Sequence, residues 1–187
     1  MVYTSTQDPR HGTPHATNGD IYTIPYNDRA GGQARPLPGA SDPQRNEYYP
    51  SFSPDDKWVA FNAANDDKSY SNPNAEVYII PSSGGTPTRL KANDGPSCAP
   101  FSSPGIANSF PKWAPFASTI GNYSYYFLTF SSTRFGSNSQ IFVAPIVVHQ
   151  DEVSTTVTTY PALHLWNQGS EANHTPIWEK LRIPIVK

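Results

Sequence analysis

A proline-led segment recurs in this chain at intervals of about 60 residues, and this spacing constrains the fold more than any other feature. Its copies read YPSFSPDDK at 49–57, FPKWAPF at 110–116 and TPIWE at 175–179. Each copy is short, apolar and bounded by turn residues, which is typical of a β-strand followed by a turn. Long helices are excluded, because proline removes a helical donor and the chain has 20 prolines in 187 residues. The chain is therefore predicted to be all-β.

Two further segments recur in the same order. The first is an apolar strand that ends in small polar residues, with copies at 2–7, 59–64 and 128–134. The second is a strand closed by proline, with copies at 20–25, 76–81 and 140–145. Gly-Gly pairs at 31–32 and 84–85 then predict hairpin turns into an outer strand. This order predicts a four-stranded antiparallel meander, whose radial repetition gives the blades of a β-propeller. An all-β sandwich with coincident turns is the alternative.

Residues 50–61, which read PSFSPDDKWVAF, resemble the TolB-type or PD40 (WD40-like) β-propeller repeat. The core of that repeat is Pro-x-Trp/Phe-Ser-Pro-Asp-Gly, followed by Ile-Ala-Phe. Asp56 stands in the usual glycine position, and Phe116-Ala117 replace the Asp-Gly turn in the copy at 110–116. The chain also resembles the C-terminal part of larger uncharacterised bacterial proteins of this type. The resemblance implies a propeller but no activity, since function depends on sites added to a fold.

The repeats predict a single propeller segment, 1–187, with about three blades. Blade a covers about 1–40 plus a closing strand at 173–179, blade b about 46–92, and blade c about 108–168. Propellers close with about four to eight blades, so one chain does not finish the ring. We favour the C-terminal piece of a longer chain, and the alternative is two copies forming a six-bladed ring about a two-fold axis. The expected partners are thus missing blades, another protein or a second copy.

Charge and hydropathy exclude two classes of partner. The formal net charge is −2 and basic residues are scattered singly, which argues against nucleic-acid binding. The longest aliphatic stretch, 146–148, is far shorter than the ~20 residues of a membrane-spanning helix. The first residues show no signal peptide, and the resemblance implies a periplasmic or extracellular bacterial location. Cys98 cannot form an intrachain disulfide and is expected to be structural.

The residues just before each repeat proline are the candidates to line a central channel, because the first strand of each propeller blade starts there. These channel candidates are Glu47, Tyr48, Asn108, Ser109, Asn173 and His174. The resemblance to TolB places such residues at a funnel that holds a metal, a water cluster or a partner peptide. The alternative is that they only satisfy backbone groups and water in a wet channel.

Three other clusters have both a structural and a functional interpretation. His11 and His15 are four residues apart, near Asp8 and Asp20, but Gly12 and Pro14 indicate a loop rather than a chelating helix. The carboxylates of Asp66, Asp67 and Asp94 suit turn caps, with a calcium loop as the alternative. The aromatic run Tyr123, Tyr125, Tyr126 and Phe127 suits packing between blades, with carbohydrate stacking as the alternative. We expect no cofactor, and Ca²⁺ is the one alternative.

No nucleophile elbow, phosphate-binding loop, dinucleotide fingerprint or zinc-protease helix occurs in the sequence. The favoured hypothesis is a non-catalytic protein-binding or scaffold module of TolB-like propeller type. One alternative is a channel-site enzyme or metal-dependent lyase that uses Glu47 or His174. The other is a structural subunit that self-assembles through exposed blade edges.

Overall fold

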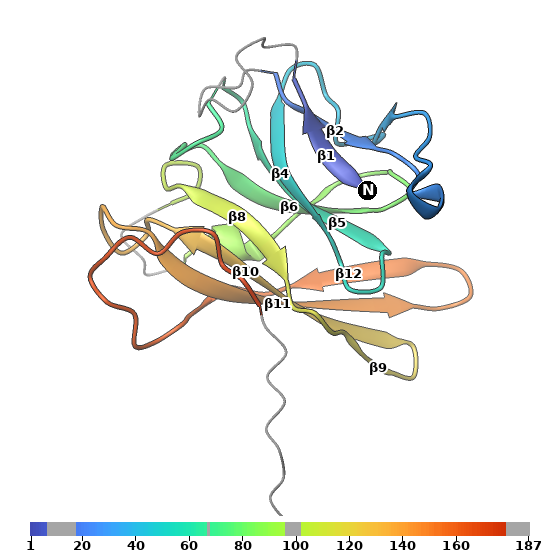
Figure 1. The fold of residues 1–187 in the computed structure, drawn as a ribbon. Helices are drawn as coiled ribbons and strands as arrows, with labels where there is room; N and C mark the ends of the chain where they lie inside the picture. Colours follow the sequence, from blue (N-terminus) through green and yellow to red (C-terminus); the bar gives the residue numbers. More distant parts are fainter. Residues whose placement is uncertain (7–17, 67, 96–101, 179–187) are drawn as a thin grey trace, which may run out of the picture.

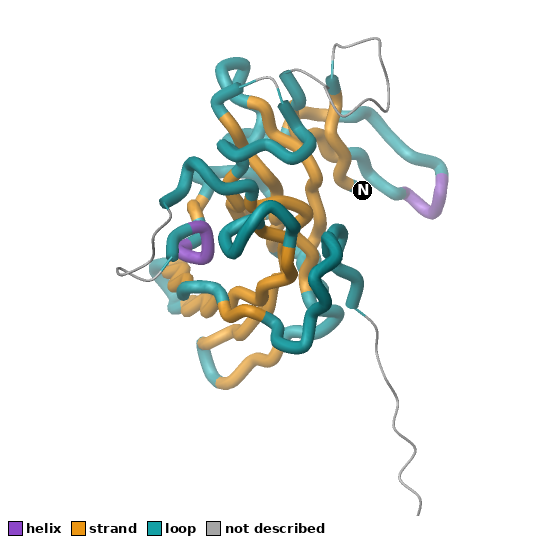
Figure 2. Tube along the Cα trace, turned by 90° about the vertical axis from the view of Figure 1, so that its left-hand side faces the viewer, coloured by secondary structure: helices purple, strands orange, loops and turns teal. Residues whose placement is uncertain are grey.

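The computed structural model describes residues 1–6, 18–66, 68–95 and 102–178 (Figure 1). Within them the regular structure is almost entirely strand, which confirms the all-β prediction. The helical elements there are single 3-10 turns, η1 (Asn27–Arg29) and η2 (Lys91–Asn93), drawn in purple in Figure 2. The strands are β1 (Val2–Ser5), β2 (Asp20–Thr23), β3 (Arg35–Pro36), β4 (Asn46–Phe52), β5 (Trp58–Ala64), β6 (Glu76–Pro81), β7 (Thr88–Arg89), β8 (Asn108–Trp113), β9 (Ser118–Ile120), β10 (Tyr123–Ser132), β11 (Gln140–Gln150), β12 (Thr155–Thr159) and β13 (Leu163–His164).

The strands form three antiparallel sheets that follow one another along the chain. The N-terminal sheet has the order β1-β2-β3, and the central sheet is a four-stranded meander, β4-β5-β6-β7. The C-terminal sheet has the order β8-β10-β11-β12, with β9 paired to β10 and β13 paired to β11. Figure 1 shows the three sheets stacked in chain order, from blue through green to orange. Each sheet therefore contacts the next one in sequence.

The same pairing register recurs in all three sheets. In each, an aromatic residue lies opposite a second aromatic residue that comes three positions before the strand-closing proline. The pairs are Tyr3 with Tyr22, Phe61 with Tyr78, and Phe130 with Phe142, at ring-centroid distances of 6.0, 5.9 and 5.9 Å. Cross-strand aromatic pairs of this kind stabilise a sheet and fix its register. The sequence repeat is therefore also a structural repeat.

The repeat proline introduces a kink at the same place in each copy. Pairing shifts register around Pro50 in β4 and around Pro111 in β8, because proline has no N–H to donate to the ladder. The preceding residues have positive φ values, 53° at Tyr49 and 58° at Phe110. Thr175, before Pro176, has a φ of 51°. The last copy thus adopts the same kinked backbone.

The last copy differs from the expectation in one respect. The predicted closing strand at 173–179 is not formed over its described part, 173–178, and these residues do not pair with β1. They lie instead against the C-terminal sheet, where the Asn173 N–H donates to the Ser139 carbonyl. A strand needs a partner backbone along its length, and apart from the Asn173 bond no described backbone pairs with 173–178.

The core lies between the sheets rather than within one of them. Side chains of β5 and β6 alternate between two faces, as the period of a strand requires. Phe61 and Ile80 belong to a buried cluster with Ile21 of the N-terminal sheet. Ala60 and Ile79 belong to a second cluster with residues of the C-terminal sheet. The central sheet is therefore covered on both faces, which explains why every residue of β5 is buried.

Candidate functional site

The predicted channel residues occupy equivalent places at three junctions. At each one, the backbone N–H of the residue three positions before a repeat proline donates a hydrogen bond to a carbonyl of the preceding repeat. That carbonyl belongs to the residue directly before β2, β6 or β11. These bonds are Glu47 to Gly19 at 2.7 Å, Asn108 to Ala75 at 3.2 Å, and Asn173 to Ser139 at 2.7 Å. The candidate residues therefore lie at equivalent junctions between repeats, but their side chains differ in role.

Glu47 has a buried carboxyl group. The residue is 1% exposed, and its Oε2 accepts a hydrogen bond from the Asp42 N–H at 3.2 Å. Burial raises the pKa of Glu47 to about 7, against the opposing effects of the Asp42 N–H and the Arg45 charge. The negative charges of Asp20 and Asp42 add to the increase. Glu47 is therefore a buried carboxyl whose protonation changes near neutral pH.

Asn108 and Tyr48 are also built into the structure. The Asn108 Oδ1 accepts from the Arg134 Nη2 at 2.9 Å, and its backbone carbonyl accepts from the Asn62 Nδ2 at 2.6 Å. The Tyr48 ring is buried and packs edge-on against Tyr49, with 4.9 Å between ring centroids. Asn108 agrees with the alternative in which the candidates satisfy buried groups instead of binding a ligand. The Tyr48 hydroxyl is also buried, but among the described residues it has no hydrogen-bond partner.

Ser109 and His174, by contrast, line one cavity of about 440 Å³, here called the serine pocket. Serine residues from four segments line it, at Ser71, Ser109, Ser131, Ser137 and Ser139. Ser109 is 4% exposed, and among the described residues its Oγ has no hydrogen-bond partner. His174 is exposed, with its ring 6.2 Å from those of Phe110 and Tyr70. The pocket therefore combines an unsatisfied hydroxyl with exposed rings at its edge.

Sequence reasoning missed a buried polar network beside this pocket. The Asn62 side chain joins β5 to β8, because its Nδ2 also reaches the Glu76 carbonyl and its Oδ1 accepts from the Phe110 N–H at 3.1 Å. The Arg134 guanidinium lies 4.5 Å from the centroid of the Phe142 ring, and burial lowers its pKa to about 10. The signal for this network was an asparagine inside an otherwise apolar strand.

A second missed feature is an ion pair at Glu76. Its carboxylate accepts from the Arg89 Nη2 at 2.7 Å and Nε at 3.0 Å, and from the Ser103 hydroxyl at 2.6 Å. Arg89 also binds Asp94 through two hydrogen bonds. Burial opposes ionisation of Glu76, but the hydrogen bonds from Arg89 and Ser103 outweigh it and lower the pKa. Glu47 and Glu76 are therefore both buried carboxyls, but the pKa of Glu47 is raised and that of Glu76 is lowered.

The other sequence clusters give little evidence of ligand sites. His11, His15, Asp8, Asp67 and Cys98 lie outside the described residues. Asp66 accepts from side-chain amides of Asn72 and Asn74 and from the Lys68 N–H, as a turn cap does, and Asp94 pairs with Arg89. In the part of the chain that the structure describes, no group of three His, Cys, Asp or Glu side chains could hold a metal ion.

The aromatic run divides between packing and exposure. Tyr126 is buried, and its hydroxyl donates to the Asp55 Oδ2 at 2.7 Å, which ties β10 to the turn after β4. Tyr123 stacks on His149 at 4.4 Å between ring centroids. Tyr125 and Phe127 are partly exposed. Of the four rings, only that of Tyr126 is buried, and the other three are exposed on the C-terminal sheet.

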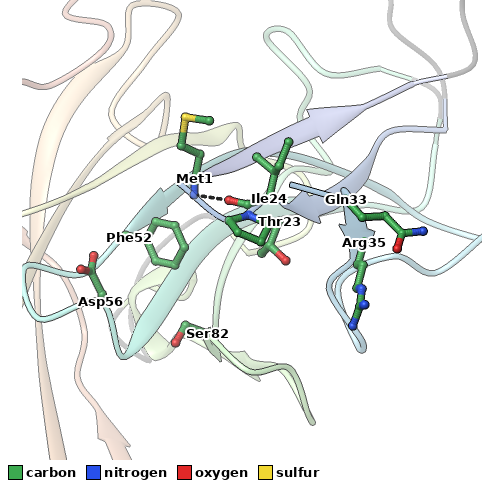
Figure 3. Close-up of a pocket in the computed structure, with 9 residues that line it drawn as sticks. Met1, Thr23, Ile24, Gln33, Arg35, Phe52, Asp56 and Ser82 are labelled. Atoms are coloured by element: carbon green, nitrogen blue, oxygen red, sulfur yellow. Dashed lines mark hydrogen bonds between the residues drawn. The ribbon is translucent and has the colours of Figure 1, made fainter. Parts of the chain in front are cut away.

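A cavity of about 650 Å³ opens beside β1, here called the β1 pocket. Met1, Ile24 and Phe52 provide its apolar wall, as Figure 3 shows. The Met1 amino group donates to the Ile24 carbonyl at 2.7 Å, which holds the start of β1 against β2. The pocket therefore lies between the N-terminal sheet and the central sheet, whose Phe52, Asp56 and Ser82 complete its lining.

None of the family models, curated proteins or solved structures compared with the chain matches it. Among the described residues, no helix has both the length and the apolar character needed to cross a membrane.

Proposed function

We propose that this chain is a non-catalytic protein-binding module built from three blades of a TolB-like β-propeller. The repeated sheet register and the repeated junction bonds support the blade assignment. Further support comes from Asp56, which takes the glycine position of the repeat motif and has a φ of 58°, in the region that favours glycine. Each sheet then corresponds to one blade, and the segments before the repeat prolines lie at the inner ends of the blades.

The serine pocket is the binding site in this proposal, and the unpartnered Ser109 hydroxyl is the observation that carries it. A buried hydroxyl without a hydrogen bond destabilises a protein, so a ligand group that supplies the bond is favoured there. An extended peptide presents alternating N–H and carbonyl groups that suit a pocket of serines. Its side chains would pack on the rings of Phe110 and Tyr70 at the edge. The ligand class is therefore an extended segment of another protein.

The test begins with peptides selected from a phage-displayed library on the wild-type chain. Their Kd is measured by fluorescence anisotropy for the wild type and for Ser109→Ala. Loss of one hydrogen bond predicts binding weaker by about threefold to tenfold. Ser82→Ala is the matched control, because Ser82 lines the β1 pocket instead. Equal affinities for the wild type and Ser109→Ala would remove the serine pocket from the proposal.

A further inference from the structure

The segment 173–178 lies against the C-terminal sheet in the way that β8 lies against the central sheet. At the earlier junction the Trp113 Nε1 donates to the Ser51 carbonyl at 3.0 Å. At the later one the Trp178 Nε1 donates to the Lys112 carbonyl at 3.3 Å. Both tryptophans come two residues after a repeat proline, and both acceptors come one residue after it. Residues 173–178 therefore occupy the place of a first strand in the next sheet.

Two parts of the repeat lack their counterparts among the described residues. The first strands β4 and β8 pair with the second strands β5 and β10, whereas 173–178 has no second strand beside it. Conversely, β1 is a second strand by its register, and it has β2 on one side and no strand on the other. An unpaired edge exposes backbone donors and acceptors that can join another strand. The two unmatched parts are complementary.

The repeat fixes how these parts would pair. In the central sheet Ser51, one residue after the repeat proline, lies opposite Ala60. In β1 the residue equivalent to Ala60 is Val2. Val2 lies opposite Thr23 and Ala60 lies opposite Ile79, and each of these partners comes two positions before a strand-closing proline. The residue of the last segment in the place of Ser51 is Ile177. Ile177 is therefore expected opposite Val2.

The side chains around both parts support this pairing. Ile177 is 88% exposed, although its neighbour Trp178 is held against the C-terminal sheet. Tyr3 is 38% exposed, while Phe61 and Phe130, which occupy the same place in the other sheets, are fully buried. A strand paired with β1 ends beside the β1 pocket, where Met1 and Phe52 are available to its apolar side chains (Figure 3). Pairing would cover apolar surface on both sides.

The free face of the C-terminal sheet offers the other half of such an interface. A cavity of about 480 Å³ there is lined by Ile141, Leu165 and Trp166, and Trp166 is 88% exposed. In the central sheet Val77 occupies the place of Ile141, and it is buried in a cluster with Phe130 and Phe142. In the N-terminal sheet the cross-strand pair equivalent to Phe130 and Phe142 is Tyr3 with Tyr22. The face is therefore shaped for the N-terminal sheet of another copy.

We propose that residues 173–178 of one chain complete the N-terminal sheet of a second copy by pairing with β1, and that the second copy does the same in return. Within one chain the segment lies against the C-terminal sheet, with the central sheet between it and the N-terminal sheet. Two copies together contain six sheets, a number within the range in which propellers close. The reciprocal exchange is a closed two-fold arrangement that leaves neither edge exposed. This inference uses the repeat geometry and does not depend on the ligand of the serine pocket.

The first measurement is the mass of the 187-residue chain by size exclusion with light scattering. The expected mass is twice that of one chain. The second measurement tests the register in a Cys98→Ser background, by mixing a Val2→Cys chain with an Ile177→Cys chain under mild oxidation. Directly opposed residues lie about 4.5–5.5 Å apart at Cα, which suits a disulfide. A covalent dimer is expected on a non-reducing gel.

The matched control pairs Tyr3→Cys with Ile177→Cys. A shift by one residue turns the side chain to the opposite face of the sheet, so only background cross-linking is expected. A chain that carries both Val2→Cys and Ile177→Cys reports on closure within one molecule. Circular dichroism checks that every variant keeps the β signature of the wild type.

Each contrary outcome overturns a definite part of the proposal. A stable monomer shows that other sequence completes these sheets, and an intrachain Val2–Ile177 disulfide shows closure within one chain. A dimer without the Val2–Ile177 cross-link shows a different interface. Failure of the peptide assay at Ser109 would leave these measurements untouched, so the two proposals fail separately.

Discussion

Replacing Glu47 by glutamine is expected to stabilise the protein above neutral pH and to change its stability little at acid pH. Burial, together with Asp20 and Asp42, gives the carboxyl a folded-state pKa of about 7, against an ordinary value of 4.5. The folded state therefore holds this proton more tightly than the unfolded chain does. The resulting stability is fully present below pH 4.5 and is lost as the pH rises through 7. Glutamine keeps the shape of the side chain but cannot ionise.

The magnitude follows from the two pKa values. Their difference corresponds to about 3 kcal/mol at 1.36 kcal/mol per pKa unit. We expect Glu47→Gln to gain about 2–3 kcal/mol at pH 8 relative to its effect at pH 4. The Asp42 N–H that now bonds the carboxylate can donate to the glutamine carbonyl oxygen, so this contact need not be lost.

The assay is urea unfolding at pH 4, 6 and 8, followed by circular dichroism. Glu76→Gln is the control, because hydrogen bonds from Arg89 and Ser103 lower the pKa of Glu76 in spite of its burial. Its substitution should therefore destabilise the protein at pH 8, in the opposite direction to Glu47→Gln. Parallel pH profiles for the wild type and Glu47→Gln would refute the reasoning about Glu47.

Three further substitutions test the contacts that connect the sheets. Asp56→Gly should raise the free energy of unfolding by about 0.5 kcal/mol and so raise the urea midpoint, because the φ of 58° at Asp56 favours glycine. A lower midpoint would contradict this. Tyr126→Phe should lower the free energy of unfolding by about 1–2 kcal/mol at pH 7, because it removes the hydrogen bond from the tyrosine hydroxyl to Asp55. Hydrogen bonds from Ser53 and Tyr126 lower the pKa of Asp55 in spite of its burial. That cost should shrink as the pH falls through the lowered pKa of Asp55, because protonation removes the charge that the Tyr126 hydroxyl bonds, and a constant cost would contradict this. Asn62→Ala should cost about 3 kcal/mol in the same assay by leaving buried groups unpaired, whereas the exposed Asn138→Ala should change little.

Local chemistry accounts for the parts of the fold that were predicted. The proline-closed segment 76–81 matches β6 (Glu76–Pro81), since alternating apolar residues and a terminal proline define a strand without reference to its partners. The glycine position of the repeat turn was recognisable at Asp56, because a positive φ is required there. Residues 173–178 carried the same sequence signal, yet they form no strand among the described residues. Strand formation depends on a partner backbone, which sequence spacing alone does not supply.

The candidate residues occupy equivalent points of the sequence repeat, but their exposure does not follow from the sequence. Tyr48 and His174 occupy the same place relative to the repeat proline, yet Tyr48 is buried and His174 is exposed. The difference arises from the neighbouring strands: β4 lies between the N-terminal sheet and β5, while 173–178 has a sheet on one side. Burial at these positions is thus a property of the junction. No residue type in the sequence encodes it.

This dependence on the junction predicts a coupling between the two proposals. Tyr48 and Ser109 occupy the place of His174 at the earlier junctions, and both are buried. Tyr48 packs in a buried cluster with Ala64 and Ala75. In the proposed dimer, the residues that would pack against His174 in the same way belong to the N-terminal sheet of the second copy. Pairing between copies should therefore cover His174 and restrict the serine pocket, and by linkage a bound peptide should weaken the pairing by the same factor. Selected peptides should bind the Val2–Ile177 cross-linked dimer more weakly than a monomer prepared by Trp178→Ala, and equal affinities would refute the coupling.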